Sequence, residues 1–180
     1  AHDPVTQSAT GMALRLGGDG IPLLQPSPST DYGTGFTGAY AVALALLHKH
    51  RTGEGQHVAT SLAYTAMTLQ SPFMQSYQGK SWDEPRGQDA LGDGPLHRAY
   101  RGKDGWLFIG ARESDLPRIA VVDGLKGIEE IRGQALAKAL EERFLAKSVQ
   151  TWVSQLNNVG VGAHPVVCDF AELMVDPWVQ

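Results

Sequence analysis

The stretch from Phe36 to Lys49 places the strongest constraint on how this chain can fold. It contains the run AYAVALALL, which consists almost entirely of good helix formers, with apolar residues on nearly every side of the resulting helix. A helix of that kind is stable where other elements cover most of its surface. We therefore expect residues 36–49 to form a deeply buried helix, which ends at the Arg-Thr-Gly-Glu-Gly turn that begins at Arg51.

The composition allows a packed core around such a helix. Of the 180 residues, 42% are hydrophobic and 19% are charged, which is typical of globular proteins. The formal net charge of -4 argues against a general nucleic-acid binder, since such proteins carry a basic surface. No apolar run approaches the roughly 20 residues that a membrane-spanning helix needs. We therefore expect partners other than nucleic acid or membrane.

Two further features concern the cellular compartment and the extent of the sequence. The single cysteine, Cys168, cannot form a disulfide within the chain, and this favours a reducing compartment such as the cytoplasm. We expect its thiol to be buried in an apolar strand. The sequence opens AHDPVTQSATG, without an initiator methionine or the features of a signal peptide. We therefore expect it to be a fragment that starts inside a larger protein.

Periodicity, capping residues and turn signals predict two groups of elements with a polar linker between them. In the first group, the apolar helix is followed by a strand over residues 56–60 and by a helix from its cap Ser61 to about Met74. The linker, residues 78–94, is rich in Gly, Asp and Pro. The second group is expected to contain strands over residues 96–101, 106–110 and 164–168 and helices over residues 115–123, 133–147, 149–156 (capped by Ser148) and 170–174.

Asp31 is the residue best suited to chemistry. It lies in the segment SerThrAspTyrGlyThrGly, whose glycines Gly33 and Gly35 permit a tight turn with accessible backbone N–H groups. The positive end of a helix that begins near Phe36 would favour an ionised carboxylate by about 0.3–1 kcal/mol, and its N–H groups could stabilise an oxyanion. The same pattern is also typical of an aspartate that only caps a helix, and on pattern alone that structural role is the more common one.

Residues 31–62 resemble a known enzyme family. Their sequence, DYGTGFTGAYAVALALLHKHRTGEGQHVATSL, is similar to that of the family III CoA-transferases of the carnitine/bile-acid-inducible (CaiB/BaiF) type, which include formyl-CoA transferase. The family pattern consists of an aspartate, a glycine, an alanine-rich helix, an Arg/Lys-Thr-Gly-x-Gly-Gln turn, a strand and a Ser-Leu helix start. In this chain the pattern is matched by Asp31, Gly35, Leu44–Leu47, Arg51–Gln56 and Ser61–Leu62.

Further matches follow in the family's order along the rest of the chain. Residues 7–11, QSATG, are similar to Gln-Ala-x-Ser-Gly of the family, and residues 94–110 are similar to its Tyr-Arg … Asp-Gly-Trp hairpin. Residues 159–177 are similar to its late segment Gly-Ile-Pro-x-x-Pro-Val … Glu-Leu … Asp-Pro. The family's first, Rossmann-like half and its glycine-rich active-site loop have no evident counterpart. The chain therefore resembles less than half of a typical member, and we expect a partial chain that lacks the N-terminal half.

The resemblance implies an α/β fold and a division of the chain into four segments. Residues 1–77 would form the end of a Rossmann-like large domain, which carries the catalytic aspartate loop. Residues 78–94 would be a linker, residues 95–166 a small α+β domain, and residues 167–180 a segment that returns to the large domain. The resemblance also implies that the full-length protein forms an interlocked homodimer.

In the family, the aspartate at the position of Asp31 is the nucleophile. The resemblance implies that Asp31 attacks an acyl-CoA thioester to form an aspartyl acyl anhydride, which CoA thiolate converts to an aspartyl-CoA thioester. An acceptor carboxylic acid then reverses these steps. Gly33 and Gly35 would supply backbone donors to the oxyanion, and Arg98 and Arg101 could bind a substrate carboxylate or a CoA phosphate. Coenzyme A would be a substrate, with no metal and no tightly bound cofactor.

Two alternatives remain open. The same superfamily contains α-methylacyl-CoA racemases, which use a His and an Asp to transfer protons at the α-carbon. His2 lies nine residues before Gly11, as in the racemases' Gly-His-Asp motif, and imidazole suits such work. The sequence after Asp31 lacks their glycine-rich pattern, which favours the transferase, and a surface or capping role is the commonest one for a residue like His2. The second alternative is a non-catalytic fragment that binds CoA or serves as a scaffold.

Overall fold

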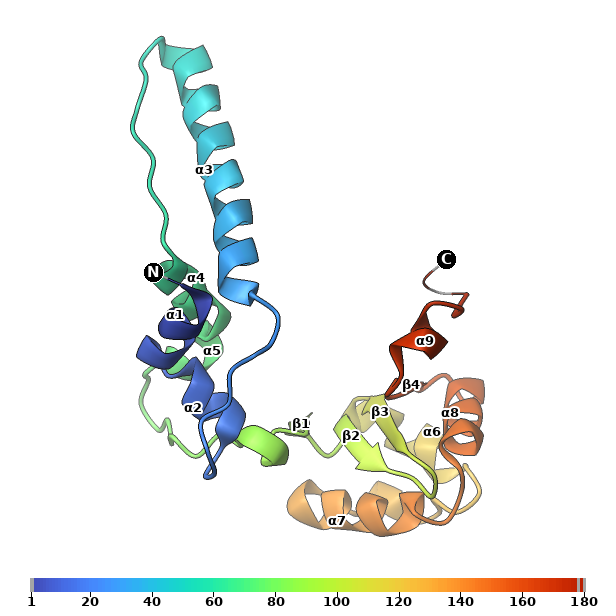
Figure 1. Cartoon of the computed structure of the whole chain (residues 1–180). Coiled ribbons are helices and arrows are strands. Elements are labelled where there is room, and N and C mark those ends of the chain that lie inside the picture. The colour runs from blue at the N-terminus through green and yellow to red at the C-terminus, as the bar shows by residue number, and fades with distance from the viewer. Residues whose placement is uncertain (1, 178, 180) are drawn as a thin grey trace. The chain divides into compact units, whose positions relative to one another are not determined.

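The chain forms two compact units, residues 1–90 and residues 91–180, in a computed structural model that describes residues 2–177 and 179 (Figure 1). The finer division into four segments, with boundaries at residues 77, 94 and 166, stays a prediction. Position 1, which begins the first segment, and position 180, which ends the last, lie outside the described residues, as does position 178.

The described part of the first unit is built from helices. Gly11, with a φ of 78°, makes the left-handed turn between the first two of them. Ser61 caps the fourth as predicted, because its Oγ accepts a hydrogen bond from the Tyr64 N–H at 3.2 Å. The elements are α1 (Asp3–Ala9), α2 (Met12–Gly17), α3 (Ser29–Thr52), α4 (Leu62–Leu69), α5 (Ser71–Met74) and the 3-10 turn η1 (Gly87–Asp89).

Helix α3 is longer and far more exposed than its sequence predicts. It begins at Ser29 instead of near Phe36, and it ends at Thr52, where the left-handed C-cap Gly53, with a φ of 80°, follows. Its start packs against α1 and α4, whereas Figure 1 shows the rest running beside only the extended chain that follows it. The expected deep burial is therefore wrong for this chain, and the Phe36 side chain is 79% exposed. No helix among residues 2–177 has the length and apolarity needed to cross a membrane.

The strand expected over residues 56–60 is not formed. These residues are extended but belong to no sheet, and the described part of the first unit offers no strand for them to pair with. A single extended segment cannot satisfy its backbone N–H and C=O groups in a ladder without a neighbour. The local β-branched residues therefore do not suffice to make a strand here.

The second unit contains a four-stranded antiparallel sheet in the order β1-β2-β3-β4. The predicted hairpin is confirmed, since β2 and β3 pair from His97–Gly110 to Arg101–Trp106. Ser148 caps α8 as predicted, by accepting a hydrogen bond from the Thr151 N–H. The elements are β1 (Gly92–Gly94), β2 (His97–Arg101), β3 (Trp106–Gly110), η2 (Glu113–Asp115), α6 (Leu116–Ala120), η3 (Ile128–Glu130), α7 (Gly133–Phe144), α8 (Val149–Asn158), β4 (Gly162–Pro165) and α9 (Phe170–Leu173).

Three aromatic side chains form the centre of the second unit's core. The Phe144 ring lies 5.1 Å from that of Tyr100 and 5.2 Å from that of Trp152, with an edge-to-face angle of 86° in the second pair. The Trp152 Nε1–H donates to the Phe144 carbonyl at 2.8 Å. The Tyr100 hydroxyl donates to the Pro95 carbonyl at 2.6 Å, and burial raises the pKa of Tyr100 to about 12. The aromatic residues therefore join the sheet to α7 and α8.

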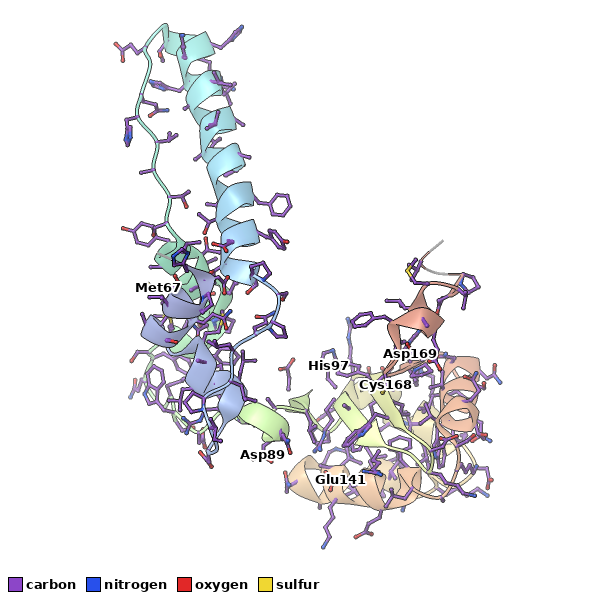
Figure 2. All side chains as sticks on the ribbon, in the orientation of Figure 1. Met67, Asp89, His97, Glu141, Cys168 and Asp169 are labelled. Carbon is purple, nitrogen blue, oxygen red and sulfur yellow. The ribbon has the colours of Figure 1, made fainter. Side chains whose placement is uncertain are left out.

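Cys168 does not occupy the buried strand that its apolar neighbours predict. β4 ends at Pro165, and Cys168 follows as an exposed residue (Figure 2). Its thiol donates only a long contact of 3.5 Å to the Val166 carbonyl. The expectation of a core thiol is therefore wrong, because the strand stops before the apolar run does.

Candidate active site at the start of α3

Asp31 lies in the first turn of α3, on an exposed part of that turn. Its backbone is fixed, because its N–H donates to the Oδ2 atom of Asp3 at 3.3 Å. Within the described residues, no hydrogen bond or ion pair engages the Asp31 carboxylate itself. Asp31 therefore has a fixed main chain and a carboxylate that is free to contact a substrate.

Asp3 is the residue that organises this helix start. Its side chain lies on α1 and is 4% exposed. Besides the Asp31 N–H, its Oδ2 atom accepts hydrogen bonds from the Thr30 N–H at 2.9 Å and from the Thr30 hydroxyl at 2.6 Å. The side-chain amide of Gln7 donates to Oδ1. Asp3 therefore caps α3 from a distant part of the sequence, at N–H groups that a helix leaves without internal partners.

Two opposing effects act on the pKa of the Asp3 carboxyl. Burial raises this pKa, while the hydrogen bonds from the Thr30 hydroxyl, the Gln7 amide and the N–H groups of Thr30 and Asp31 lower it. The net result is a pKa below its ordinary value. Asp3 is thus a buried, ionised carboxylate at neutral pH, and all four of its donors are neutral groups.

The sequence-based predictions gave Asp3 no role, although it follows His2 at the Asp position of the racemases' Gly-His-Asp motif. Asp3 and Gln7 are four residues apart, so they share one face of a helix, and Gln7 falls within the motif that resembles the family. The side-chain carbonyl of Gln7 also accepts from the Gln25 N–H at 2.8 Å. Nothing in a local pattern, however, indicates that the partner of Asp3 lies 27 residues further along the chain.

Gly33 and Gly35 lie within α3 and not in a tight turn before it. The turn expected at these residues is therefore wrong, because a helix directs each N–H toward the carbonyl four residues earlier. Their role as oxyanion donors stays a prediction, and it requires the first turns of α3 to open when substrate binds. In the structure, Gly33 has a packing role, since a Cβ atom there would lie 2.6 Å from Thr65 Cγ2. Its missing side chain lets α3 approach α4.

His2 lies next to this site. It is the exposed N-cap residue of α1, and its carbonyl accepts from the Thr6 N–H at 3.1 Å and from the Thr6 hydroxyl at 3.3 Å. Asp3, the next residue in the chain, accepts a hydrogen bond from the Asp31 N–H. The main chain of His2 therefore lies near that of Asp31. The proton-transfer pair that these two residues would form in a racemase stays a prediction.

Arg98 and Arg101 both lie on β2 of the second unit, but their surroundings differ. Arg98 forms an ion pair with Glu141 of α7, with an Nη2–Oε1 distance of 2.9 Å. Its guanidinium also lies 4.9 Å from the centre of the Tyr100 ring, so it is engaged within its own unit. Arg101 is exposed at the last position of the strand. Of the two, Arg101 is the more available to an anion.

A cavity of about 260 Å³, which no sequence motif predicts, lies in the second unit near the start of α7. Its size is below the range typical of ligand sites, so it cannot enclose a molecule as large as CoA. The cavity is lined by Asp93, Gly94, Pro95, Leu96, His97, Ala111, Glu113, Arg132, Gly133 and Leu136.

Nowhere in the described part of the chain do three or more His, Cys, Asp or Glu side chains gather as metal ligands would.

Comparisons with known proteins agree with the motifs and the fold. The family model described as CoA-transferase family III matches residues 1–180. The chain is 28% identical over 156 residues to the CoA-transferase/lyase DddD of Marinomonas sp. (strain MWYL1), a match that covers 86% of this chain and 18% of that protein. It is 25% identical over 178 residues to the human alpha-methylacyl-CoA racemase, with coverages of 92% and 46%.

A solved structure has the same fold. The CAIB/BAIF family protein from Brucella suis matches with a TM-score of 0.71 and 23% identity, over 99% of this chain and 50% of that one. The predicted α/β fold of the CaiB/BaiF type is therefore confirmed. The chain spans less than half the length of the two curated relatives and half the length of the Brucella suis protein.

Proposed function

The chain belongs to CoA-transferase family III, and on that premise we propose that the whole protein moves CoA between an acyl-CoA thioester and a carboxylic acid. The nucleophile in this proposal is Asp31. The observation that carries it is the state of this side chain, an exposed carboxylate without a partner among the described residues, on a main chain held by Asp3. Such a group is available to attack a carbonyl carbon.

The proposed reaction consists of four balanced substitutions. A carboxylate oxygen of Asp31 attacks the thioester carbonyl, the C–S bond breaks, and CoA leaves as thiolate with an aspartyl acyl anhydride left behind. The thiolate attacks the aspartyl carbonyl and releases the donor's carboxylate, which leaves an aspartyl-CoA thioester. The acceptor carboxylate displaces CoA thiolate from that thioester to form a second anhydride. The thiolate finally attacks the acceptor's acyl carbon, so that acyl-CoA leaves and Asp31 is regenerated.

Other parts of the chain have supporting roles in this proposal. Gly33 and Gly35 would present oxyanion donors once the helix start opens, and Arg101, more than Arg98, would bind a substrate carboxylate or a CoA phosphate. Coenzyme A acts as a substrate and not as a tightly bound cofactor. For the full-length protein we propose an interlocked homodimer in the cytoplasm, with the catalytic aspartate in the large domain (residues 1–77).

A racemase is the second candidate, and one observation favours it. His2 adjoins Asp3 in the sequence, and Asp3 bonds to the Asp31 main chain, which supports a pairing of the His2 imidazole with the Asp31 carboxylate. Such a pair could remove and return a proton at the α-carbon of a 2-methylacyl-CoA. The two candidates differ in a direct assay. The racemase exchanges the α-proton with deuterium from solvent and leaves the thioester intact, whereas the transferase exchanges CoA.

Trapping of the covalent intermediate tests the transferase. The complete protein is incubated with acyl-CoA and hydroxylamine, digested and analysed by mass spectrometry, and a hydroxamate is expected on Asp31. Asp31→Asn should lower turnover by about a thousandfold or more. Asp19→Asn, which changes an exposed aspartate of the same unit, serves as the matched control and should keep full activity. An unmodified Asp31 in an enzyme with normal turnover would contradict the proposal.

A further inference from the structure

The proposed reaction makes no use of Asp3, although its carboxylate is both buried and charged. It is a carboxylate with 4% exposure, and no cation is among the groups that hydrogen-bond to it in the described residues. Burial of a charge without a counterion is costly unless hydrogen bonds replace the lost water. Three of its four hydrogen bonds come from Thr30 and Asp31, so its stabilisation depends on the start of α3.

This arrangement changes what the Asp31 side chain can do. The first N–H groups of a helix have no internal partners, and an aspartate in that turn commonly folds back to accept hydrogen bonds from them. Here the N–H groups of Thr30 and Asp31 already donate to Asp3, and the Ser29 N–H donates to the Ser27 carbonyl at 2.7 Å. The Asp31 carboxylate therefore has no local donor to fold back onto, which accounts for its outward, unpartnered state.

We propose that Asp3 is a positioning residue for Asp31, an inference that rests on the proposed function. By occupying the donors at the start of α3, Asp3 keeps the neighbouring carboxylate unbonded and correctly placed for attack on the thioester. Hydrogen bonds to a carboxylate stabilise its charge, and a carboxylate stabilised in that way is a poorer nucleophile. Asp3 thus acts on the reaction through the hydrogen bonds that it withholds from Asp31, without touching the substrate.

Asp3→Asn separates this role from a purely structural one. An asparagine has only one side-chain oxygen for two sets of donors. If the Gln7 amide, which is fixed by Gln25, takes that oxygen, the N–H groups of Thr30 and Asp31 become free to bond to the Asp31 carboxylate. The rate constant for hydroxamate formation on Asp31 should fall by about tenfold to a hundredfold, while KM for acyl-CoA changes by less than about twofold. A merely structural defect would instead reduce the fraction of molecules labelled and leave the rate constant of the folded molecules unchanged.

A second variant keeps the test decisive if Asp3→Asn does not fold. Thr30→Val removes the hydroxyl donor and keeps both the shape of the side chain and the charge of Asp3. Without that hydrogen bond, Asp3 is held less firmly against the N–H groups of Thr30 and Asp31, so these donors are free to bond to Asp31 for part of the time. The labelling rate constant should therefore fall by a smaller factor, about threefold to tenfold. Asp19→Asn is again the control with no expected change.

The possible outcomes distinguish the two proposals. Folded Asp3→Asn or Thr30→Val protein that labels Asp31 at the wild-type rate overturns the positioning role and leaves the transferase intact. Wild-type protein that turns over without labelling Asp31 overturns the proposed function, and the positioning role with it. Slower labelling at unchanged KM and unchanged labelled fraction supports both.

Discussion

Gly33 of α3 faces Thr65 of α4 so closely that a Cβ atom on the glycine would lie 2.6 Å from Thr65 Cγ2. The hydroxyls of Thr65 and Thr34 lie 2.7 Å apart at the same crossing, and Thr65 is buried. Thr65 therefore cannot turn away without loss of this hydrogen bond. The crossing fixes the distance between the helix that carries Asp31 and the helix that Ser61 caps.

Gly33→Ala should destabilise the first unit by about 1–3 kcal/mol, because the new methyl group forces the two helices apart. Gly35→Ala is the matched control, since nothing lies within 4 Å of its Cβ position, and it should be neutral or stabilising by up to about 1 kcal/mol. Urea denaturation measures both free energies of unfolding. The double variant with Thr65→Ser, which removes Cγ2 and keeps the hydroxyl, should recover most of the loss. Equal stability of the two glycine variants would contradict the close crossing.

The stability of the protein should decrease as the pH falls below about 4, in part through Asp3. Its pKa is lower in the folded than in the unfolded state, so its contribution is complete above the unfolded pKa. That contribution is lost as the pH falls through the folded pKa, because the unfolded state then binds the proton more readily. Melting temperatures measured from pH 6 to pH 3 should fall less steeply in Asp3→Asn than in the wild type. Parallel curves would mean that folding does not lower the pKa of Asp3.

Phe144→Ala should destabilise the second unit by about 3–5 kcal/mol, because the side chain is completely buried between two other aromatic rings. Loss of the edge contact to Trp152 should also change the near-UV circular dichroism. Leu145→Ala is the control from the next position, where the side chain is 51% exposed, and its effect should stay within about 0.5 kcal/mol. Similar losses in the two variants would show that the core is placed elsewhere.

The two arginines of β2 should respond differently to replacement by alanine. Arg98→Ala breaks the contacts to Glu141 and the Tyr100 ring, so the melting temperature should fall, by an amount equivalent to about 1 kcal/mol. Arg101→Ala should leave the melting temperature unchanged and raise KM for acyl-CoA about fivefold or more. Arg101→Lys keeps the charge and should recover part of the affinity. An unchanged KM in Arg101→Ala would remove this residue from the substrate site.

Features that depend on adjacent residues could be predicted from the sequence. The caps Ser61 and Ser148 and the β2–β3 hairpin are each specified within a few residues, and each is found where the pattern places it. The resemblance to the family depends on motifs of the same short range. Local chemistry therefore sufficed for most element boundaries in the second unit.

The start of α3 could not be predicted in this way. Its cap is the side chain of Asp3, which is 27 residues away from Thr30, so no window around Ser29 contains the information. The exposure of α3 and of Cys168 was also predicted wrongly. Apolar residues favour burial, and this is what α3 and the run around Cys168 indicate. Whether they are buried depends on the elements that pack around them, and here they remain exposed.

The hydrogen bonds between Asp3 and the first turn of α3 also bear on the order in which the molecule is assembled. A helix can propagate through the alanine-rich residues on its own, within about a microsecond. Its reactive end, however, becomes ordered only after a long loop has closed and α1 has docked. A partly folded molecule would therefore contain the helix without a correctly placed nucleophile, so that reactivity develops only as the tertiary structure is completed.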